Sequence, residues 1–272
     1  MTTVVIDTSA ATANPASLST YNLIAYSNAL ATLAPIIAAT QQSVDTAPAN
    51  LATWSLLDVW RSGGNGGQVT VTFASPEVID TVAFYAHNLA TTGGTVQVEY
   101  STDGGASWDD FVAATAVSAS GPWMAFAPGG VLAAMWRLTF TGTAPTEIGN
   151  LFVGRAMELP YPPGIGFTPP PLGRQHRIET SISGNGRLLD RALSREITKT
   201  RISLPYVSGQ WARSTWNAFR AHAERFPFYY SWCHDDYPGD AAFCYSDGNV
   251  PPAPFSAIRL SSIDLNCFAL TE

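Results

Sequence analysis

The sequence predicts a mainly β protein in two parts: an antiparallel β-sandwich, then an α+β unit whose antiparallel sheets carry one helix. Three observations lead to this fold class. Short runs of alternating apolar and polar residues, separated by Gly, Pro, Asn and Asp, fill the chain from Trp54 to about residue 157. A proline-rich segment follows, and beyond it a single helical pattern lies between further strands. We therefore expect a sandwich over 1–157, a linker over 158–173 and an α+β unit over 174–272.

Alternating apolar residues mark the strands of the predicted sandwich, because successive side chains of a strand point to opposite faces of its sheet. The residues that share one face in each of three runs are Val69, Val71 and Phe73, then Val96, Val98 and Tyr100, and then Trp136, Leu138 and Phe140. Strands this short, without helices between them, indicate antiparallel pairing. Residues 1–20 predict a terminal arm or a first edge strand, and 21–40 fit either a strand or a short helix that Pro35 would break.

Composition and charge restrict the classes of function. Hydrophobic residues make up 46% of the chain, enough for a core, and charged residues only 13%. Residues 1–160 hold three Arg and no Lys against 11 Asp and Glu, a balance of −8, whereas 161–272 hold 11 Arg and Lys against 10 acids, a balance of +1. An acidic first half argues against nucleic acid as its partner. The chain starts without a signal-peptide pattern and has no apolar run long enough to cross a bilayer, so we expect synthesis in the cytoplasm.

The α+β unit begins with a predicted hairpin. Alternating residues lead into a turn at Gly184 to Gly186, and strands at 187–194 and 195–208 follow. The last of these places Ile202, Leu204 and Tyr206 on one face. With the helix and the strands after it, the expected order is β-β-β-α-β-β-β.

Gly209 to Asp247 combines the helix with two aromatic-rich strands. Ser208 and Gly209 stand at the N-cap position, and Pro227 is expected to end the helix. The residues that recur at steps of three or four on one helix face are Trp211, Thr215, Phe219, His222 and Phe226. The three cysteines, Cys233, Cys244 and Cys267, are expected to be buried free thiols, with a Cys233–Cys244 bridge as the alternative.

The order of motifs in the predicted sandwich points to a known fold. A tryptophan-bearing loop, WSLLDVWRS, precedes a glycine loop and the strand VTVTF. The runs TVAFYAHNL and VQVEYSTDGGASW follow, and the sandwich closes on MWRLTF and EIGNLFVG. This order resembles the galactose-binding-like, discoidin-type jelly roll and covers about residues 20–157. The resemblance implies a jelly roll and leaves its ligand open.

Loop aromatics beside a cation are candidates for carbohydrate binding, because sugars stack on aromatic faces and Arg supplies fixed donors. Trp54, Trp60 and Arg61, next to the glycine-rich loop at 61–68, form the predicted carbohydrate site. The alternative is that both tryptophans pack beneath the sandwich.

No catalytic constellation is recognisable in the sequence. Ser101 to Trp108 fits the Asp-box pattern of sialidases, but a single box is better explained as a hairpin turn built on Asp103. His234, Asp235 and Asp236 could ligate a metal, yet their position predicts a turn in which Asp bonds its own backbone. We therefore expect no enzyme activity, no catalytic residues, no cofactor and no metal.

The C-terminal part carries a second resemblance. The phrase ISLPYVSGQW, followed by FPFYYSW and AFCY, comes after a hairpin rich in Arg and Thr. Over 174–272 this arrangement resembles the tail-tube-like fold of siphophage tail proteins, among them distal and minor tail proteins that also carry a jelly roll. The resemblance implies a homo-oligomeric ring in a virion tail tip, with six copies favoured and three possible. It also implies contacts with tail-tube and hub proteins and, through the jelly roll, with host-surface glycan.

Basic residues gather in the predicted hairpin. Those expected at contacts between ring neighbours or along the ring lumen are Arg177, Arg187, Arg191, Arg195, Lys199 and Arg201. A solvated hairpin face is the alternative reading of the same charges. A carbohydrate-binding module protein, with the C-terminal part as its platform, is the alternative function.

Overall fold

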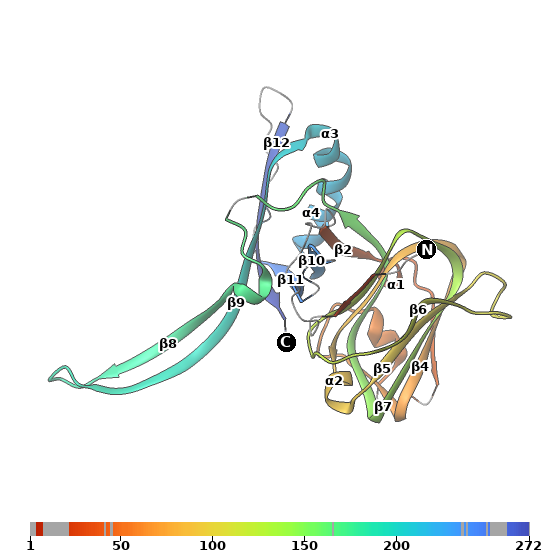
Figure 1. Ribbon diagram of the computed structural model, residues 1–272, viewed down its shortest axis with the longest axis horizontal. Coiled ribbons are helices and arrows are strands. Elements are labelled where there is room, and N and C mark those ends of the chain that lie inside the picture. Colours follow the sequence, from red (N-terminus) through yellow and green to blue (C-terminus); the bar gives the residue numbers. More distant parts are fainter. Residues whose placement is uncertain are drawn as a thin grey trace.

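A two-sheet sandwich forms the N-terminal half, and one of its sheets continues into the C-terminal half (Figure 1). This computed structural model describes residues 4–7, 22–40, 42–43, 46–164, 166–234, 237, 239–248, 250 and 260–271, without side-chain detail at 4–7, 177 and 193–196. The mainly β prediction with a single substantial helix is confirmed.

The first sheet contains β3 (Ile36–Thr40), the start of β4 (Trp60–His87), the middle of β7 (Trp123–Glu158), β5 (Thr95–Ser101) and β6 (Asp109–Ala116). The pairing runs antiparallel throughout: Val69 lies opposite Leu138 and Val71 opposite Trp136, while Val98 pairs with Leu138 from the other side. The alternating residues that the sequence predicted on one strand face therefore share a face in this sheet.

The second sheet begins with β1 (Val4–Asp7) and the start of β7, followed by the end of β4 and the end of β7. Beside it lies β2 (Asn22–Asn28), which pairs on one side with β7 and on the other with β10 (Phe228–Trp232). From there the sheet continues through β11 (Ala241–Ser246), β12 (Leu260–Leu270), β9 (Leu188–Ser208) and β8 (Arg174–Ile182). Hydrogen bonds between strands thus connect the predicted sandwich to the predicted α+β unit. The boundaries of these two parts stay predictions.

Both faces of this second sheet are buried within the sandwich region. Val82 and Phe84 point into the core between the two sheets. Ala83 and Tyr85 point the other way, into a separate apolar cluster that also contains Phe243 from the C-terminal half. Because β4 and β7 each contribute to both sheets, the sandwich is jelly-roll-like, as expected.

The stretch that the sequence left open, described over 22–40, contains two strands and a helical turn. After β2, Asn28 caps the single turn α1 (Ala29–Thr32) by accepting a hydrogen bond from the Leu30 amide. Pro35 lies between this turn and β3. Two further short pieces flank the sandwich strands: η1 (Pro48–Ala52) and α2 (Leu89–Thr92).

The predicted helix is present as α3 (Gly209–Trp211), the π-helical η3 (Ala212–Trp216) and α4 (Asn217–Ala223) without interruption. The Ser208 side chain accepts from the Trp211 amide, as its N-cap position predicts. The helix stops before Phe226, however, so Phe226 lies beyond its end rather than on its apolar face.

Two expectations for β9 were wrong. Residues 188–208 form one continuous strand, so the predicted break at 194–195 is absent. Ile202 and Leu204 are buried, but Tyr206 is 70% exposed and Val207 is buried in its place. The cause is a register shift beside Pro205: Leu204 pairs with Ile263, while Val207 pairs with Ser261.

The proline-rich segment lies against the C-terminal sheet through Tyr161 and Phe167. The Tyr161 hydroxyl accepts from the Tyr206 amide at 2.8 Å, and the Phe167 ring centre lies 5.1 Å from that of Trp232. The segment ends in η2 (Pro170–Leu172).

All three cysteines are buried and free, which excludes the alternative Cys233–Cys244 bridge.

Candidate functional site

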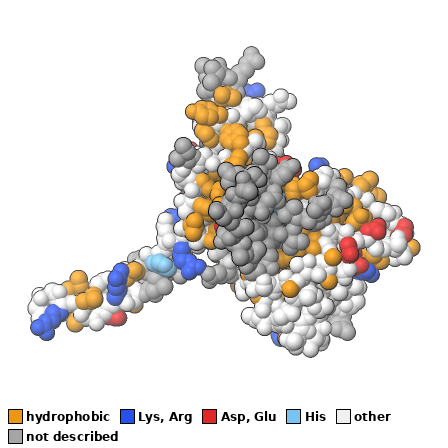
Figure 2. Space-filling model, in the orientation of Figure 1, with side chains coloured by type: hydrophobic (Ala, Val, Ile, Leu, Met, Phe, Trp, Pro, Cys, Tyr) orange, Lys and Arg blue, Asp and Glu red, His pale blue; other side chains and the backbone are white. Residues whose placement is uncertain are grey.

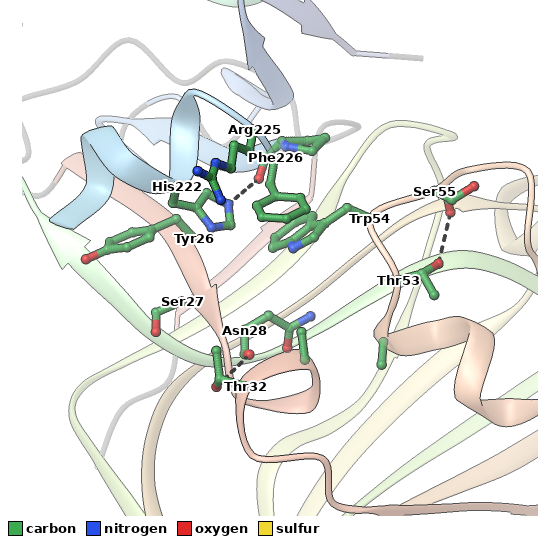
Figure 3. A pocket seen from close by; sticks show the side chains of 13 residues that line it. Tyr26, Ser27, Asn28, Thr32, Thr53, Trp54, Ser55, His222, Arg225 and Phe226 are labelled. Atoms are coloured by element: carbon green, nitrogen blue, oxygen red, sulfur yellow. Dashed lines mark hydrogen bonds between the residues drawn. The ribbon is translucent and has the colours of Figure 1, made fainter.

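A cleft of about 790 Å³ lies where the sandwich meets the end of the C-terminal helix (Figure 3). Three segments supply its lining: β2 with α1, the loop after η1, and the chain from the end of α4 to Pro227. Its volume is within the range of small-molecule sites, which are typically apolar clefts with a few oriented polar groups.

Aromatic rings form much of this cleft. The ring centres of Trp54 and His222 are 5.3 Å apart with their planes at 72°, and those of His222 and Phe226 are 5.4 Å apart. Tyr26 lies on the other side of His222, at 5.5 Å. Trp54 is half-buried and Phe226 is 47% exposed, so both retain surface that a ligand can cover.

Trp54 is held from behind by packing and by one buried hydrogen-bond chain. Its ring packs against the aromatic cluster of Phe152, Tyr229 and Phe243. The Tyr229 hydroxyl donates to Asn150 Oδ1, and Asn150 Nδ2 donates to the carbonyl of Thr53, the residue before Trp54. Asn150 and Tyr229 are fully buried, so this loop is anchored by interior groups.

His222 and Arg225 contribute polar atoms to the cleft. His222 Nε2 lies 2.8 Å from the Pro227 carbonyl, which can only accept, so Nε2 carries the proton and Nδ1 is left as an acceptor. Desolvation lowers the pKa of His222, outweighing the opposite effect of that hydrogen bond, and therefore favours the neutral ring. The Arg225 side chain is exposed and makes no ion pair or hydrogen bond with the part of the chain that the structure describes.

The three predicted carbohydrate-binding residues do not come together. Trp54 lines the cleft. Trp60 is 0% exposed in the sandwich core and offers no face to a sugar, so it cannot belong to the predicted site. Arg61 lies outside the cleft lining and pairs with Glu147 at 3.1 Å. The alternative reading, a tryptophan packed within the sandwich, holds for Trp60.

The single Asp-box sequence forms a hairpin turn, as the simpler reading predicted. Asp103 accepts from the Ser101 hydroxyl and from both the amide and the hydroxyl of Ser107. These hydrogen bonds, the Ser107 hydroxyl first, lower the pKa of Asp103. The carboxylate therefore serves the turn's own backbone and hydroxyls.

Among the described residues, no group of three or more His, Cys, Asp and Glu side chains is placed to hold a metal ion. His234 is buried, and its predicted partners Asp235 and Asp236 lie outside the described residues. In the described part of the chain, no helix is both long and apolar enough to cross a membrane.

A second distinctive feature is the arm, which we define as β8, the turn and β9 up to Ile197. It projects away from the rest of the molecule (Figure 1). β9 has β12 as a partner only from Thr198 onward, so over Leu188 to Ile197 β8 is its only strand partner among the described strands. Isolated two-stranded hairpins are marginally stable in water.

One face of the arm carries exposed apolar side chains at both ends, with Thr180 and Arg191 between them. Ile178 and Ile182 alternate onto the same face of β8, and Leu188 lies directly opposite Ile182. Ile182 and Leu188 are each 63% exposed. The other face is polar and carries Glu179, Ser181 and Asp190. A ribbon with exposed apolar side chains, which packs against no other element among the described residues, is typical of an interaction surface.

The basic residues predicted for ring contacts are split between the arm and the body. Arg187 and Arg191 are exposed on the arm, where Figure 2 shows basic side chains. In the body, Arg201 pairs with Asp264 at 2.8 Å, and the Lys199 ammonium lies 5.0 Å from the ring centre of Phe268. The side chains of Arg177 and Arg195 lie outside the described set.

Sequence reasoning did not assign Asn150, Arg225 or Phe226 to the candidate site. It named His222 and Phe226 only as members of one helix face. The sequence offered one signal, because Arg225 and Phe226 stand directly before Pro227, at the predicted end of the helix that carries His222. Only the structure shows that this helix end faces another part of the chain.

Comparison with solved structures finds similarity to carbohydrate-binding modules. CpGH89CBM32-6 from Clostridium perfringens is 17% identical with a TM-score of 0.41, over 47% of this chain and 98% of that one. The family 32 module of C. perfringens NanJ, solved in complex with galactose, is 10% identical with a TM-score of 0.39, over 48% of this chain and 98% of that one. A pectin-binding carbohydrate-binding module is 18% identical with a TM-score of 0.39, over 46% and 93%. No protein-family model and no curated protein matches the chain.

Proposed function

We propose that this protein binds glycans in the cleft between its sandwich and the end of its helix. The observation that carries the proposal is the partly exposed Trp54 ring, held rigidly from behind and facing a cleft of sugar-sized volume. A pyranose has apolar C–H faces that pack on aromatic rings and equatorial hydroxyls that need donors and acceptors. Trp54 and Phe226 supply the rings, and His222 Nδ1 and the Arg225 guanidinium supply an acceptor and donors.

Preorganisation supports the same proposal. A side chain that is already fixed loses little conformational entropy when a ligand binds. The Tyr229–Asn150–Thr53 hydrogen bonds fix the loop of Trp54 before any ligand arrives. Neither this activity nor the second candidate below requires a catalytic residue.

A glycan array probed with the folded protein tests the proposal. We expect hits that disappear in Phe226→Ala, a truncation of a 47% exposed side chain that leaves the core intact. Trp54→Ala should also abolish binding, although its packing against Phe152 means that its folding must be checked by near-UV circular dichroism. Leu57→Ala is the matched control, since Leu57 is on the same loop, 93% exposed and outside the cleft lining. A silent array, or hits unaffected by both cleft variants, would refute glycan binding here.

We propose as a second candidate a structural role in the tail tip of a siphophage, as a ring-forming distal or minor tail protein. The arm favours this, because its apolar face needs a partner and a neighbouring copy in a closed ring would supply one. Six copies remain the favoured number and three the alternative. In that setting the chain would reside in the virion, beside tail-tube and hub proteins, with its cleft available to host-surface glycan.

The native mass of the purified protein tests ring formation. We expect a closed oligomer that dissociates when Ile182 and Leu188 are both changed to Ser, because the double substitution makes the exposed apolar face polar. Glu179→Ser, on the opposite face of the arm, should leave the mass unchanged. A wild-type monomer that also fails to co-purify with phage particles would overturn this candidate.

A further inference from the structure

The charge of the cleft differs from that of the chain around it. The first 160 residues have a balance of −8, as counted above, yet none of the described residues that line the cleft is Asp or Glu. Of these described lining side chains, only the cationic Arg225 carries a fixed charge. Arg225 comes from the C-terminal part, whose balance is +1, and it places a positive charge where that part meets the acidic first half.

Within the described part of the chain, Arg225 also has no counter-ion, because of how its neighbours are arranged. Glu224, next to it in the sequence, is engaged by Arg220 at 3.1 Å, one helical turn away. Arg225 itself follows the last turn of α4, and its amide, rather than its side chain, bonds back to the His222 carbonyl. As far as the described residues show, its five donors therefore stay available to a ligand.

The other groups of the cleft favour a sugar that carries the anion. Guanidinium and carboxylate match as two parallel hydrogen bonds, which gives both affinity and orientation. Trp54 and Phe226 lie in the same cleft and offer aromatic surface to a pyranose ring. His222 is kept largely neutral at pH 7 by desolvation, so recognition of charge falls to Arg225.

We infer that the ligand of the cleft is an acidic saccharide, whose carboxylate is bound by Arg225 while its ring packs beside Trp54 and Phe226. This inference rests on the proposed glycan-binding function and narrows its ligand to sugars such as uronates or sialates. The site combines two segments of the N-terminal half with the end of the C-terminal helix, so it belongs to the whole chain rather than to the jelly roll.

Isothermal titration with paired probes tests the inference on the full chain. The pairs are a galacturonate trimer against the corresponding neutral galactose trimer, and 3′-sialyllactose against lactose. We expect at least one acidic probe to bind about tenfold or more tightly than its neutral counterpart, since a hydrogen-bonded charge pair contributes on that scale. The member of the pair that binds distinguishes a uronate from a sialate.

Arg225→Gln should abolish the preference for the acidic probe without abolishing binding of the ring. Arg213→Gln is the matched control, because it makes the same change in net charge at an exposed position outside the cleft lining. Equal affinity for acidic and neutral probes, or a preference that survives Arg225→Gln, would overturn the inference while leaving Trp54-dependent glycan binding in place. Absence of binding to every probe and every array glycan would overturn both.

Discussion

The hydroxyl of Tyr229 donates a 2.6 Å hydrogen bond to Oδ1 of Asn150, joining a strand of the C-terminal half to the last strand of the sandwich. Both side chains are fully buried. Because Asn150 also donates to the carbonyl of Thr53, this one bond connects strand β10 with the loop that carries Trp54. The stability of the interface and the shape of the cleft therefore depend on the same pair of residues.

Tyr229→Phe removes the donor and leaves Asn150 Oδ1 buried without a partner. We expect a loss of about 1–3 kcal/mol in the free energy of unfolding, the usual cost of an unsatisfied buried polar group. Chemical denaturation followed by tryptophan fluorescence measures it. Tyr245→Phe, at a ring that is 37% exposed, should stay within about 0.5 kcal/mol of the wild type. Equal stability of the two variants would show that the Tyr229–Asn150 bond contributes nothing net.

Local alternation was enough to predict the strands, because inward positions such as Val69, Val71 and Trp136 repeat with the period of the pleat and are all buried. It could not predict that β2 connects the two halves. That connection depends on pairing of Asn22–Asn28 with β7 and with β10, partners more than 100 residues away that no local pattern specifies. The exposure of Tyr206 could not be predicted for a related reason, because the register shift is set jointly by Pro205 and the partner strand.

The candidate site was predicted only in part for the same physical reason. Trp54 could be named because an aromatic in a loop is a local signal. Arg225 and Phe226 become part of the site only when the helix end is packed against the sandwich, which is a tertiary event. Trp60 gave the same local signal as Trp54, but it is the first residue of β4 and lies on the inward face of that strand. The burial of a tryptophan between a loop and a strand cannot be predicted before the start of the strand is known.

Two Arg–Glu pairs of the sandwich should differ in their contribution to stability. Arg137 donates through Nε and Nη2 to the two oxygens of Glu99, each at 2.7 Å, and its guanidinium carbon lies 4.2 Å from the ring centre of Trp108. The side chains of this pair are only 25% and 12% exposed. Lys cannot reproduce a two-point contact and a stacked plane, so we expect Arg137→Lys to cost about 1–2 kcal/mol.

The control is Arg61→Lys, in the pair with Glu147 whose side chains are 51% and 38% exposed. Solvent screens that pair, and we expect a change below about 0.5 kcal/mol. Thermal and chemical denaturation of both variants provide the comparison. If Arg61→Lys were the more harmful substitution, burial would not be what determines the contribution of these ion pairs.

Asp240 should make stability depend on pH in the direction opposite to most carboxylates. Burial raises its pKa to about 6, from 3.8 for an unperturbed side chain. Between these values the folded protein holds more protons than the unfolded chain, so the contribution of Asp240 to the free energy of unfolding falls as pH rises from about 4 to about 6.

Asp240→Asn keeps a neutral side chain at every pH and should therefore be more stabilising, relative to the wild type, at pH 7 than at pH 4. Denaturant unfolding at pH 4, 5, 6 and 7 gives the difference directly. Asp109→Asn, at an exposed position, controls for the change in net charge. A difference between Asp240→Asn and wild type that does not vary with pH would contradict the raised pKa.

The base of the arm should be intolerant of any side chain at Gly173. Its carbonyl accepts from the Lys199 amide at 3.0 Å, which ties the end of the linker to β9 just before the arm begins. A Cβ added to Gly173 would collide with the Lys199 backbone carbonyl, an atom that cannot swing aside. We expect Gly173→Ala to cost about 1–3 kcal/mol, as overpacking does, and to increase hydrogen exchange in the amides of the arm.

Gly184→Ala is the control, because a Cβ at that position in the arm's turn meets no atom within 4 Å. Faster exchange in both variants alike would mean that the arm is not anchored through Gly173.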